Sequence, residues 1–293
     1  MIDRHILPAY GKYKLERLAP PFIQQQVNQW AKEYNQDGEG FKHYPQLHAL
    51  TKRILQYGIS IQAIETNPAR EIIVPRRAER DKKGLKYFPD DELKKFLDYL
   101  DTLDNSFKNF FDTVLYKLLL ATGLRIGEAL ALEWSDIDFQ GATLEVNKTL
   151  NLKKETNSPK TKTSKRTLDL DKKTVLMLRL YQARQAQIGR EIGVSYTRVF
   201  SNTLDQYKRP HPLNQHLKNH LKNAGCQPLT FHAFRHTHAS ILLNAGLGYK
   251  EIQVRLGHST LSMTMDTYSH LSKKNEKRAV SVFETALENI KSS

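Results

Sequence analysis

The stretch Thr230-Phe-His-Ala-Phe-Arg-His-Thr-His-Ala239 has the pattern of a helix with polar chemistry on one face and core on the other. Thr230 is a favourable N-cap residue. His232 and Arg235 follow at the i, i+3 spacing that places two side chains on one face, close to the helix N-terminus. The opposite face is expected to carry Phe234, Ile241, Leu242 and Ala245, before Gly246 ends the helix. Such a His-x-x-Arg pair is suited to holding a phosphodiester, although it also arises often by chance.

His236 and His238 lie on the same helix. His232 and His236 have the i, i+4 spacing of a two-histidine metal motif. However, an arginine lies between them and no acidic or cysteine third ligand is nearby, so we predict no metal site and no other cofactor. His236 and His238 are expected to cap the helix, pack or contact solvent.

Arg125 and His258 stand at the ends of predicted helices. Arg125 follows a Thr-Gly turn at a helix start, where its guanidinium and nearby helix amides can meet phosphate oxygens. The simpler interpretation is an i, i+3 ion pair with Glu128. His258 follows Leu256-Gly257 at the end of a short helix, where it could bind phosphate or simply cap the helix C-terminus.

Tyr268 lies within Asp266-Thr-Tyr-Ser-His270, which is expected to form a polar turn. A tyrosine there is usually a surface or packing residue. Its pKa of about 10 makes it a poor nucleophile unless cations stabilise the phenolate. Lys162 lies in a basic stretch and could protonate a leaving oxygen as a general acid. Composition alone leaves Lys160 and Lys165 as competitors, and a solvated basic hairpin as the simpler interpretation.

The composition favours a polyanionic partner. The 293 residues include 45 Lys and Arg against 31 Asp and Glu, a net charge of +14, which attracts DNA, RNA or anionic membrane. A merely basic protein is the alternative. The single cysteine, Cys226, excludes an internal disulfide and a cysteine-rich metal site. No apolar run approaches the roughly 20 residues of a spanning helix, and the N-terminus has no signal-peptide pattern. We therefore expect a cytoplasmic protein without membrane contact.

The first 75 residues have helical patterns throughout. One helix is expected to open at Pro20-Pro21 and a second to stop at Gly58, followed by a short third helix over residues 59–65. Their buried faces are expected to be Ile23, Val27, Trp30 and Tyr34 in the first helix, and Leu47, Leu50, Ile54 and Tyr57 in the second. This indicates an all-α N-terminal domain over residues 1–75.

Residues 76–86 contain no core-forming pattern and are predicted to be a basic interdomain linker. An ordinary solvated loop is equally consistent with this stretch. The basic residues there that are candidates for DNA contact are Arg76, Arg77, Arg80, Lys82 and Lys83, with Lys160 and Lys165 added from the later basic stretch.

The second domain is predicted over residues 87–293. Helices are expected to begin at Asp90, to run from Phe107 to Thr122 with a stop at Gly123, and to cover Arg125 to Trp134. Alternation around Leu144 and Val146, and again around Leu168 and Leu170, predicts two strands, after which helices resume at Lys173. The second domain is thus mainly α with a small antiparallel β-sheet, an α+β fold.

Five short motifs occur in order along this domain: Thr122-Gly-Leu-Arg-Ile-Gly-Glu128, Lys160-Thr-Lys-Thr163, Thr230–Ala239, Leu256-Gly-His-Ser259 and Asp266-Thr-Tyr-Ser-His270. Together they resemble the tyrosine recombinases, the phage-integrase family, and look like integrases of phages and conjugative elements of Gram-positive bacteria. The resemblance covers roughly residues 87 to 293 and extends more weakly to the N-terminal domain, which looks like the family's core-binding domain. The family's small arm-site-binding domain has no counterpart before Ile6, which implies a truncated or shortened relative.

The resemblance implies a site-specific recombinase that cuts and rejoins DNA through a 3′-phosphotyrosine intermediate, without metal or ATP, for integration or excision of a mobile element or prophage. Tyr268 would be the nucleophile, and Lys162 would protonate the leaving 5′ oxygen. Arg125 and Arg235 would hold the non-bridging oxygens. His232 would help to deprotonate the tyrosine or bind the phosphate, and His258 would donate a further hydrogen bond.

The implied partners are double-stranded DNA at attachment-site core sequences, a homotetramer on synapsed DNA, and an excisionase or host DNA-bending protein, in the bacterial cytoplasm at the nucleoid. A type IB topoisomerase-like enzyme and a non-catalytic DNA-binding regulator with the same fold are the alternatives. The C-terminal segment could dock on a neighbouring protomer or pack on its own domain through Val280, Phe283, Leu287 and Ile290.

Overall fold

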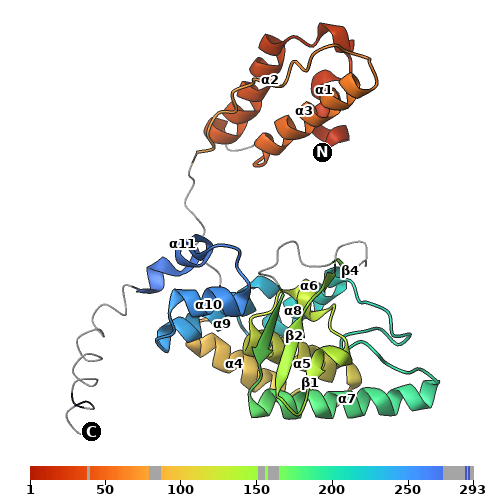
Figure 1. The fold of residues 1–293 in the computed structure, drawn as a ribbon, viewed down its shortest axis with the longest axis vertical. Helices are drawn as coiled ribbons and strands as arrows, with labels where there is room; N and C mark the ends of the chain where they lie inside the picture. The colour runs from red at the N-terminus through yellow and green to blue at the C-terminus, as the bar shows by residue number, and fades with distance from the viewer. Residues whose placement is uncertain are drawn as a thin grey trace. The chain divides into compact units, whose positions relative to one another are not determined.

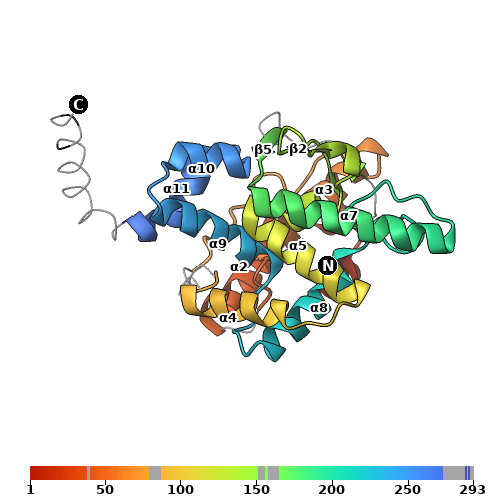
Figure 2. The ribbon, with the colours of Figure 1, turned by 90° about the horizontal axis from the view of Figure 1, so that it is seen from below.

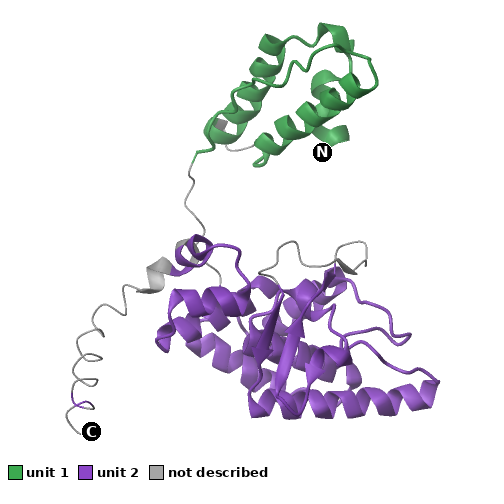
Figure 3. Ribbon diagram, viewed as in Figure 1, with its two compact units in different colours: residues 1–83 green, residues 84–293 purple. Residues whose placement is uncertain are grey.

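The computed structural model describes residues 1–37, 40–78, 87–150, 156–157 and 165–272, together with Glu288 and Ile290. The chain forms two compact units, Met1–Lys83 and Gly84–Ser293 (Figure 3). Each unit has a hydrophobic core of its own. No helix among the described residues is long and apolar enough to cross a membrane.

The first unit is helical throughout its described secondary structure (Figure 1). Its two long helices are α2 (Pro20–Lys32), which opens on two prolines and continues as the π-turn η3 (Glu33–Asp37), and α3 (Tyr44–Ser60). Three short helical turns precede them: η1 (Ile2–Ile6), α1 (Leu7–Tyr10) and η2 (Leu15–Arg17). The predicted buried face of α2 is confirmed, since Ile23, Val27, Trp30 and Tyr34 are all buried.

The predicted buried face of α3 is wrong by about one position. Leu47 is buried, but Ile54 and Tyr57 are exposed, and the core side carries His48, Thr51, Leu55 and Gly58 instead. The helix also runs through Gly58 to Ser60. A side chain at Gly58 would press on Ile64 at 3.3 Å, so the glycine serves close packing rather than a helix stop. Residues 61–65 form turns, not a third helix, because Gln62 adopts a positive φ of 58°.

The second unit is built around α5 (Phe107–Thr122), which ends where the sequence predicted it, at Gly123 with φ of 67°. Helix α4 (Asp90–Asp101) precedes it, and the single turn α6 (Ile126–Ala129) follows. The predicted helix from Arg125 to Trp134 is therefore too long. After α6 the backbone pairs with a distant segment: Thr197 O accepts from Trp134 N, and Leu132 O accepts from Val199 N. The 3-10 turn η4 (Trp134–Asp136) then leads into the sheet.

The main sheet has three antiparallel strands in the order β1 (Ile137–Asp138), β2 (Thr143–Val146) and β5 (Arg166–Asp169). Leu144 lies opposite Leu168, and both are buried, as their alternation with polar residues predicted. A second antiparallel pair joins β3 (Thr149–Leu150) to β4 (Thr156–Asn157). This small sheet in a mainly helical unit confirms the predicted fold class.

In the described part of the second unit, the sheet is followed by α7 (Lys172–Ile192), α8 (Pro210–Asn223), α9 (Phe231–Asn244), α10 (Tyr249–Leu256) and α11 (Leu261–Ser272). Helix α9 packs along α5, and α10 and α11 pack against α9 and against each other at one end of the unit (Figure 2). The expected inner face of α9 is partly wrong. Phe234 is buried, but Ile241 and Ala245 are exposed, because α10 and α11 cover the side that carries Ala239 and Leu243.

Candidate functional site

Arg235 is the buried centre of the predicted cluster, with only 2% of its surface exposed. Its Nη1 donates to the carbonyl of Gly123 at 2.9 Å, and its Nη2 donates to that of Leu256 at 2.7 Å. These carbonyls lie at the C-terminal ends of α5 and α10, where helix dipoles favour a cation. A guanidinium has five N–H donors, so these two bonds fix its orientation while further donors can meet an oxyanion.

Gly123 makes this arrangement possible. Its φ of 67° disfavours other residues, and a Cβ atom there would lie 2.7 Å from both His238 and Leu256. His238 is itself fixed, because its Nδ1 lies 2.7 Å from the carbonyl of Leu120 and its Nε2 accepts from Arg255 Nε. The role of His238 is thus to join α9 to α5 and α10, which agrees with its predicted packing role.

Arg125 does form the predicted ion pair with Glu128, with 2.8 Å between Nη1 and Oε1. Glu128 is buried and also pairs with Arg166, a residue that the sequence did not single out. Burial opposes ionisation of Glu128, but Arg166 and Arg125 outweigh it and lower the pKa of the carboxyl. The pair does not remove Arg125 from the cluster. After burial itself, the charge of Arg125 is the next cause of the lowered pKa of Arg235.

His232 is the most outward member of the cluster, with its side chain exposed. Partial burial, then the charges of Arg235 and Arg125, lower the pKa of its imidazole. Its ring lies edge-on to that of His236, with 5.0 Å between centroids. An exposed imidazole whose pKa two guanidiniums lower would be accessible to a phosphate. The structure records no hydrogen bond between His232 and Tyr268 among the described residues.

Tyr268 lies on α11 and not in a polar turn, so this expectation was wrong. The helix forms because α11 packs on α9 and α10, and the Tyr268 ring fills a small core with Ala239, Leu243, Ile252 and Leu256. The side chain is 1% exposed. Burial raises the pKa of its hydroxyl to about 12, and the nearby Arg235 charge acts in the opposite direction.

His236 is the side chain that contacts the tyrosine, and the sequence interpretation missed it. Its Nδ1 lies 2.8 Å from the Tyr268 hydroxyl oxygen. Burial, then the neighbouring His232 and Arg235, lowers the pKa of His236 to about 4. The imidazole is therefore neutral near pH 7, and in its Nε2–H tautomer Nδ1 accepts the hydrogen bond that the hydroxyl donates. The i, i+4 spacing of His232 and His236 is a sequence signal that both side chains share one helix face. It was interpreted as a metal motif, and it does not by itself predict a contact with Tyr268.

His258 joins the end of α10 to α11. It follows Gly257, whose φ of 67° ends the helix, and its Nδ1 lies 2.8 Å from the hydroxyl oxygen of Thr264. Burial, then the charges of Arg235 and Arg125, lowers the pKa of His258 to about 4. The histidine thus faces the arginines and also fixes α11, the helix that carries Tyr268.

Several predicted residues fall outside the described part of the chain: Lys160, Lys162, Arg80, Lys82, Lys83, Val280, Phe283 and Leu287. Lys165 is described and exposed just before β5, and Ile290 is 74% exposed. Arg76 and Arg77 are exposed in the first unit. The side chain of Asn35 bonds to the backbone of Arg76 and Ala78, so the start of the predicted linker is held against this unit.

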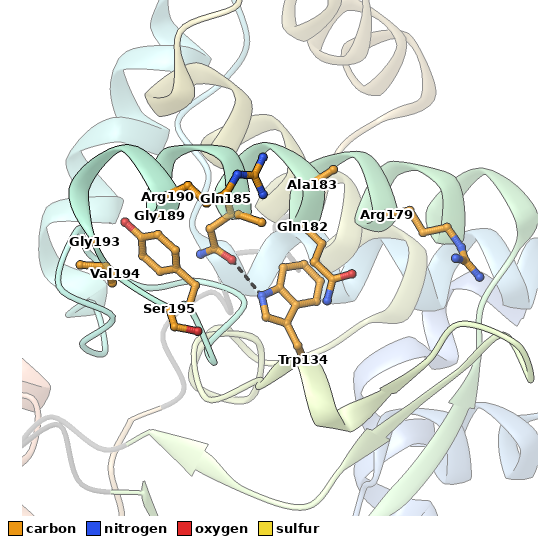
Figure 4. Close-up of a pocket in the computed structure, with 12 residues that line it drawn as sticks. Trp134, Arg179, Gln182, Ala183, Gln185, Gly189, Arg190, Gly193, Val194 and Ser195 are labelled. Atoms are coloured by element: carbon orange, nitrogen blue, oxygen red, sulfur yellow. Dashed lines mark hydrogen bonds between the residues drawn. The ribbon is translucent and has the colours of Figure 1, made fainter.

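A separate pocket lies away from the Arg235 cluster. It has a volume of about 780 Å³ and is lined by α7, the loop after it and Trp134 (Figure 4). The Trp134 indole donates to Gln185 at 2.8 Å on its floor. None of its lining residues belongs to the Arg235 cluster. Within the described ranges, no three His, Cys, Asp or Glu side chains are arranged to hold a metal ion.

The Arg235 cluster brings positive charge close to a phenol. The charges of Arg125 and Arg235 lower the pKa of His232, and the Arg235 charge acts on the Tyr268 hydroxyl. Fixed cations of this kind stabilise charge that develops on phosphoryl oxygens. All the described members lie within the second unit.

The pattern of the Phage integrase family matches residues 86–275. The ICEBs1 integrase of Bacillus subtilis strain 168 is 26% identical over 284 residues, covering 94% of this chain and 73% of the relative. A tyrosine recombinase XerC-like protein of Caldanaerobacter subterraneus subsp. tengcongensis is 29% identical over 276 residues, covering 87% and 69%.

Solved structures share the fold. A Tn1549 transposon integrase in complex with circular intermediate DNA has a TM-score of 0.63 at 18% identity, covering 89% of this chain and 85% of that one. A lambda integrase dimer bound to a core site has a TM-score of 0.61 at 17% identity, covering 90% and 68%. With the family pattern spanning most of the second unit, the chain belongs to the phage integrase family, the tyrosine recombinases.

Proposed function

We propose that this chain is a site-specific DNA recombinase that integrates and excises a mobile element or prophage. The observation that supports the proposal is the place of the buried Arg235, whose pKa responds both to Arg125 and to Tyr268. The relatives support the mobile element, since they include an integrase of Bacillus subtilis and a transposon integrase solved with DNA.

In the proposed reaction, the Tyr268 oxygen attacks a DNA phosphorus, the bond to the 5′ oxygen breaks, and a 3′-phosphotyrosine forms. Arg125 and Arg235 bind the non-bridging oxygens, and His232 and His258 add hydrogen bonds. Lys162 protonates the leaving 5′ oxygen. The 5′ hydroxyl of another strand then reverses the step. The covalent bond conserves the phosphoester energy, so strand exchange requires no ATP.

The resting tyrosine is far from reactive. With a pKa of about 12, forming its phenolate at pH 7 costs about 7 kcal/mol. Tyr268 therefore stays protonated before DNA binds. The cations around the phosphate must instead stabilise the transition state as the new bond forms.

The proposed partner is duplex DNA at attachment-site core sequences. The net charge of +14 favours it, and the exposed Arg76, Arg77 and Lys165 are candidates for backbone contacts. Exchange between two duplexes involves four strands, so we propose a tetramer on synapsed DNA. An excisionase or host DNA-bending protein would assist it at the bacterial nucleoid.

The test is covalent capture on a nicked suicide duplex that carries the candidate attachment site. Wild-type protein should form an adduct with nucleotide mass on Tyr268, and Tyr268→Phe should form none. Tyr249→Phe is the matched control, because it removes a hydroxyl that lies against the backbone of Tyr268 without touching the reacting atom.

Persistent adduct in Tyr268→Phe would remove the tyrosine from the role. Absence of adduct with wild-type protein would favour a non-catalytic DNA-binding protein. Relaxation of supercoiled DNA without exchange between two attachment sites would favour a topoisomerase-like enzyme.

A further inference from the structure

We propose that His236 is the proton acceptor for Tyr268, and so a further catalytic residue of the recombination reaction proposed above. The inference rests on that proposed function and on the contact between His236 Nδ1 and the Tyr268 hydroxyl oxygen, which are 2.8 Å apart. The two rings meet edge to face, with 5.7 Å between centroids and 65° between planes. This distance lies within the reach that a general base requires.

The direction of the hydrogen bond depends on the charge and on the tautomer of His236. His236 is neutral near pH 7, because burial and the nearby His232 and Arg235 lower its pKa to about 4. A neutral imidazole has one nitrogen that accepts and one that donates. In the Nε2–H tautomer of His236 the free Nδ1 is the acceptor, and the Tyr268 hydroxyl, whose raised pKa keeps its proton in place, donates to it.

The other polar groups around the tyrosine are poorly placed to take this proton. Arg235 and Arg125 can only donate. His258 directs its Nδ1 at Thr264. His232 contacts the ring of His236 and faces outward. Among the described residues, His236 is the side chain recorded within hydrogen-bond distance of the Tyr268 hydroxyl.

The arriving phosphate makes the transfer feasible. Without DNA the transfer is strongly unfavourable, since the donor pKa is about 12 and the acceptor pKa about 4. Among the described residues, the charged and titratable groups recorded against His236 are His232 and Arg235 on α9, Tyr268 on α11 and His258 after α10, and Arg125 acts in turn on Arg235. A phosphodiester adds negative charge among these cations, which raises the pKa of the imidazole.

The proton then moves as the new bond forms. The Tyr268 oxygen bonds to phosphorus, the phosphorus–O5′ bond breaks, the phenol proton passes to His236 Nδ1, and O5′ takes a proton from Lys162. In the reverse step the protonated His236 returns its proton to the leaving phenol. All atoms and charges balance without another reactant.

The test compares adduct formation on the nicked suicide duplex by wild type, His236→Ala and His236→Asn. The Asn Oδ1 lies close to the Nδ1 position and can accept the hydroxyl hydrogen bond, but it cannot take the proton. We expect both variants to form adduct about 100-fold more slowly. Their rates should rise about tenfold per pH unit between pH 7 and 9, as solvent hydroxide replaces the lost base, whereas the wild-type profile should be flatter. Added imidazole should restore part of the rate to His236→Ala.

His211→Ala is the control, because His211 is exposed on α8. Salt-dependent binding of each variant to duplex DNA reports folding. A wild-type rate and pH profile in His236→Asn would overturn the proton-transfer role, as would a rate within threefold of wild type in His236→Ala. If wild-type protein itself forms no adduct, the proposed function fails; if it does and the His236 variants match it, only this inference fails.

Discussion

Arg166 and Glu128 form a buried ion pair, with 2.9 Å between Nη2 and Oε2 and both side chains only 5% exposed. Arg166 also donates from Nε to the carbonyl of Arg255 at 2.8 Å, so the pair joins β5 to α10. The same carboxylate holds Arg125. A single buried carboxylate thus orients one arginine of the site and ties it to the sheet.

Glu128→Gln should destabilise the second unit by about 3 kcal/mol, because it leaves a buried guanidinium without its counter-charge. Urea unfolding at pH 7 measures this. Asp101→Asn, which breaks the exposed pair with Lys117, should cost less than about 1 kcal/mol. Equal losses in the two variants would show that burial of the pair is unimportant.

The stability that Glu128 provides should depend on pH. Its folded-state pKa is lowered, so the contribution is present above the unfolded value of about 4.3 and is lost as pH falls through the folded pKa. Unfolding free energy measured from pH 7 down to pH 3 should therefore fall more steeply in wild type than in Glu128→Gln. Parallel curves would contradict the lowered pKa.

Arg235→Lys should reduce adduct formation about 100-fold or more. A lysine ammonium cannot reach the carbonyls of Gly123 and Leu256 and a phosphate together, because it lacks the planar fork of the guanidinium. Single-turnover rates on the suicide duplex measure the loss. Arg179→Lys on α7 is the control and should leave the rate unchanged; a matching loss there would indicate a general effect of lysine substitution.

Gly123→Ala should destabilise the protein by about 2 kcal/mol or more, and more than Gly193→Ala does. Both glycines have φ near 70°, but a Cβ at Gly123 would lie 2.7 Å from His238 and Leu256, whereas nothing lies within 4 Å at Gly193. Thermal or urea unfolding of the two variants isolates the cost of the close contact. Because the Gly123 carbonyl holds Arg235, the first variant should also lose adduct formation. Equal stability of the two variants would contradict the packing.

DNA affinity should fall steeply with salt, by a factor on the order of 10³ or more between 50 and 200 mM, if six or more phosphates are contacted. Replacing Arg76 and Arg77 together by Gln should lower the log–log slope by about 2. Arg184→Gln on the exposed side of α7 is the control and should keep the slope. Binding that is flat with salt would argue against phosphate contacts.

The sequence predicted those elements whose ends are set by local chemistry. Helix α5 begins after Ser106, whose side chain caps it, and ends at Gly123 in the left-handed conformation. Asp171 caps α7 in the same way. Elements shaped by distant partners were missed. The end of α6 depends on backbone pairing with residues 197–199.

The same distinction between local and distant contacts applies to the residues of the site. The His232 and Arg235 pair is visible because both residues share one helix face. His236 and Arg166 are not, since their roles depend on a tyrosine 32 positions later and a glutamate 38 positions earlier. Side-chain identity alone does not show which of three histidines on α9 faces α11.

The interior position of the Tyr268 phenol has a biological consequence. An enzyme that can break DNA must avoid doing so by accident, and the Tyr268 ring is buried against aliphatic side chains with its hydroxyl on His236, which limits access of other phosphates to the oxygen. Cutting would then be limited to a DNA phosphate that reaches this buried oxygen. The fidelity of cutting would thus come partly from the restricted access to the nucleophile before the correct duplex is bound.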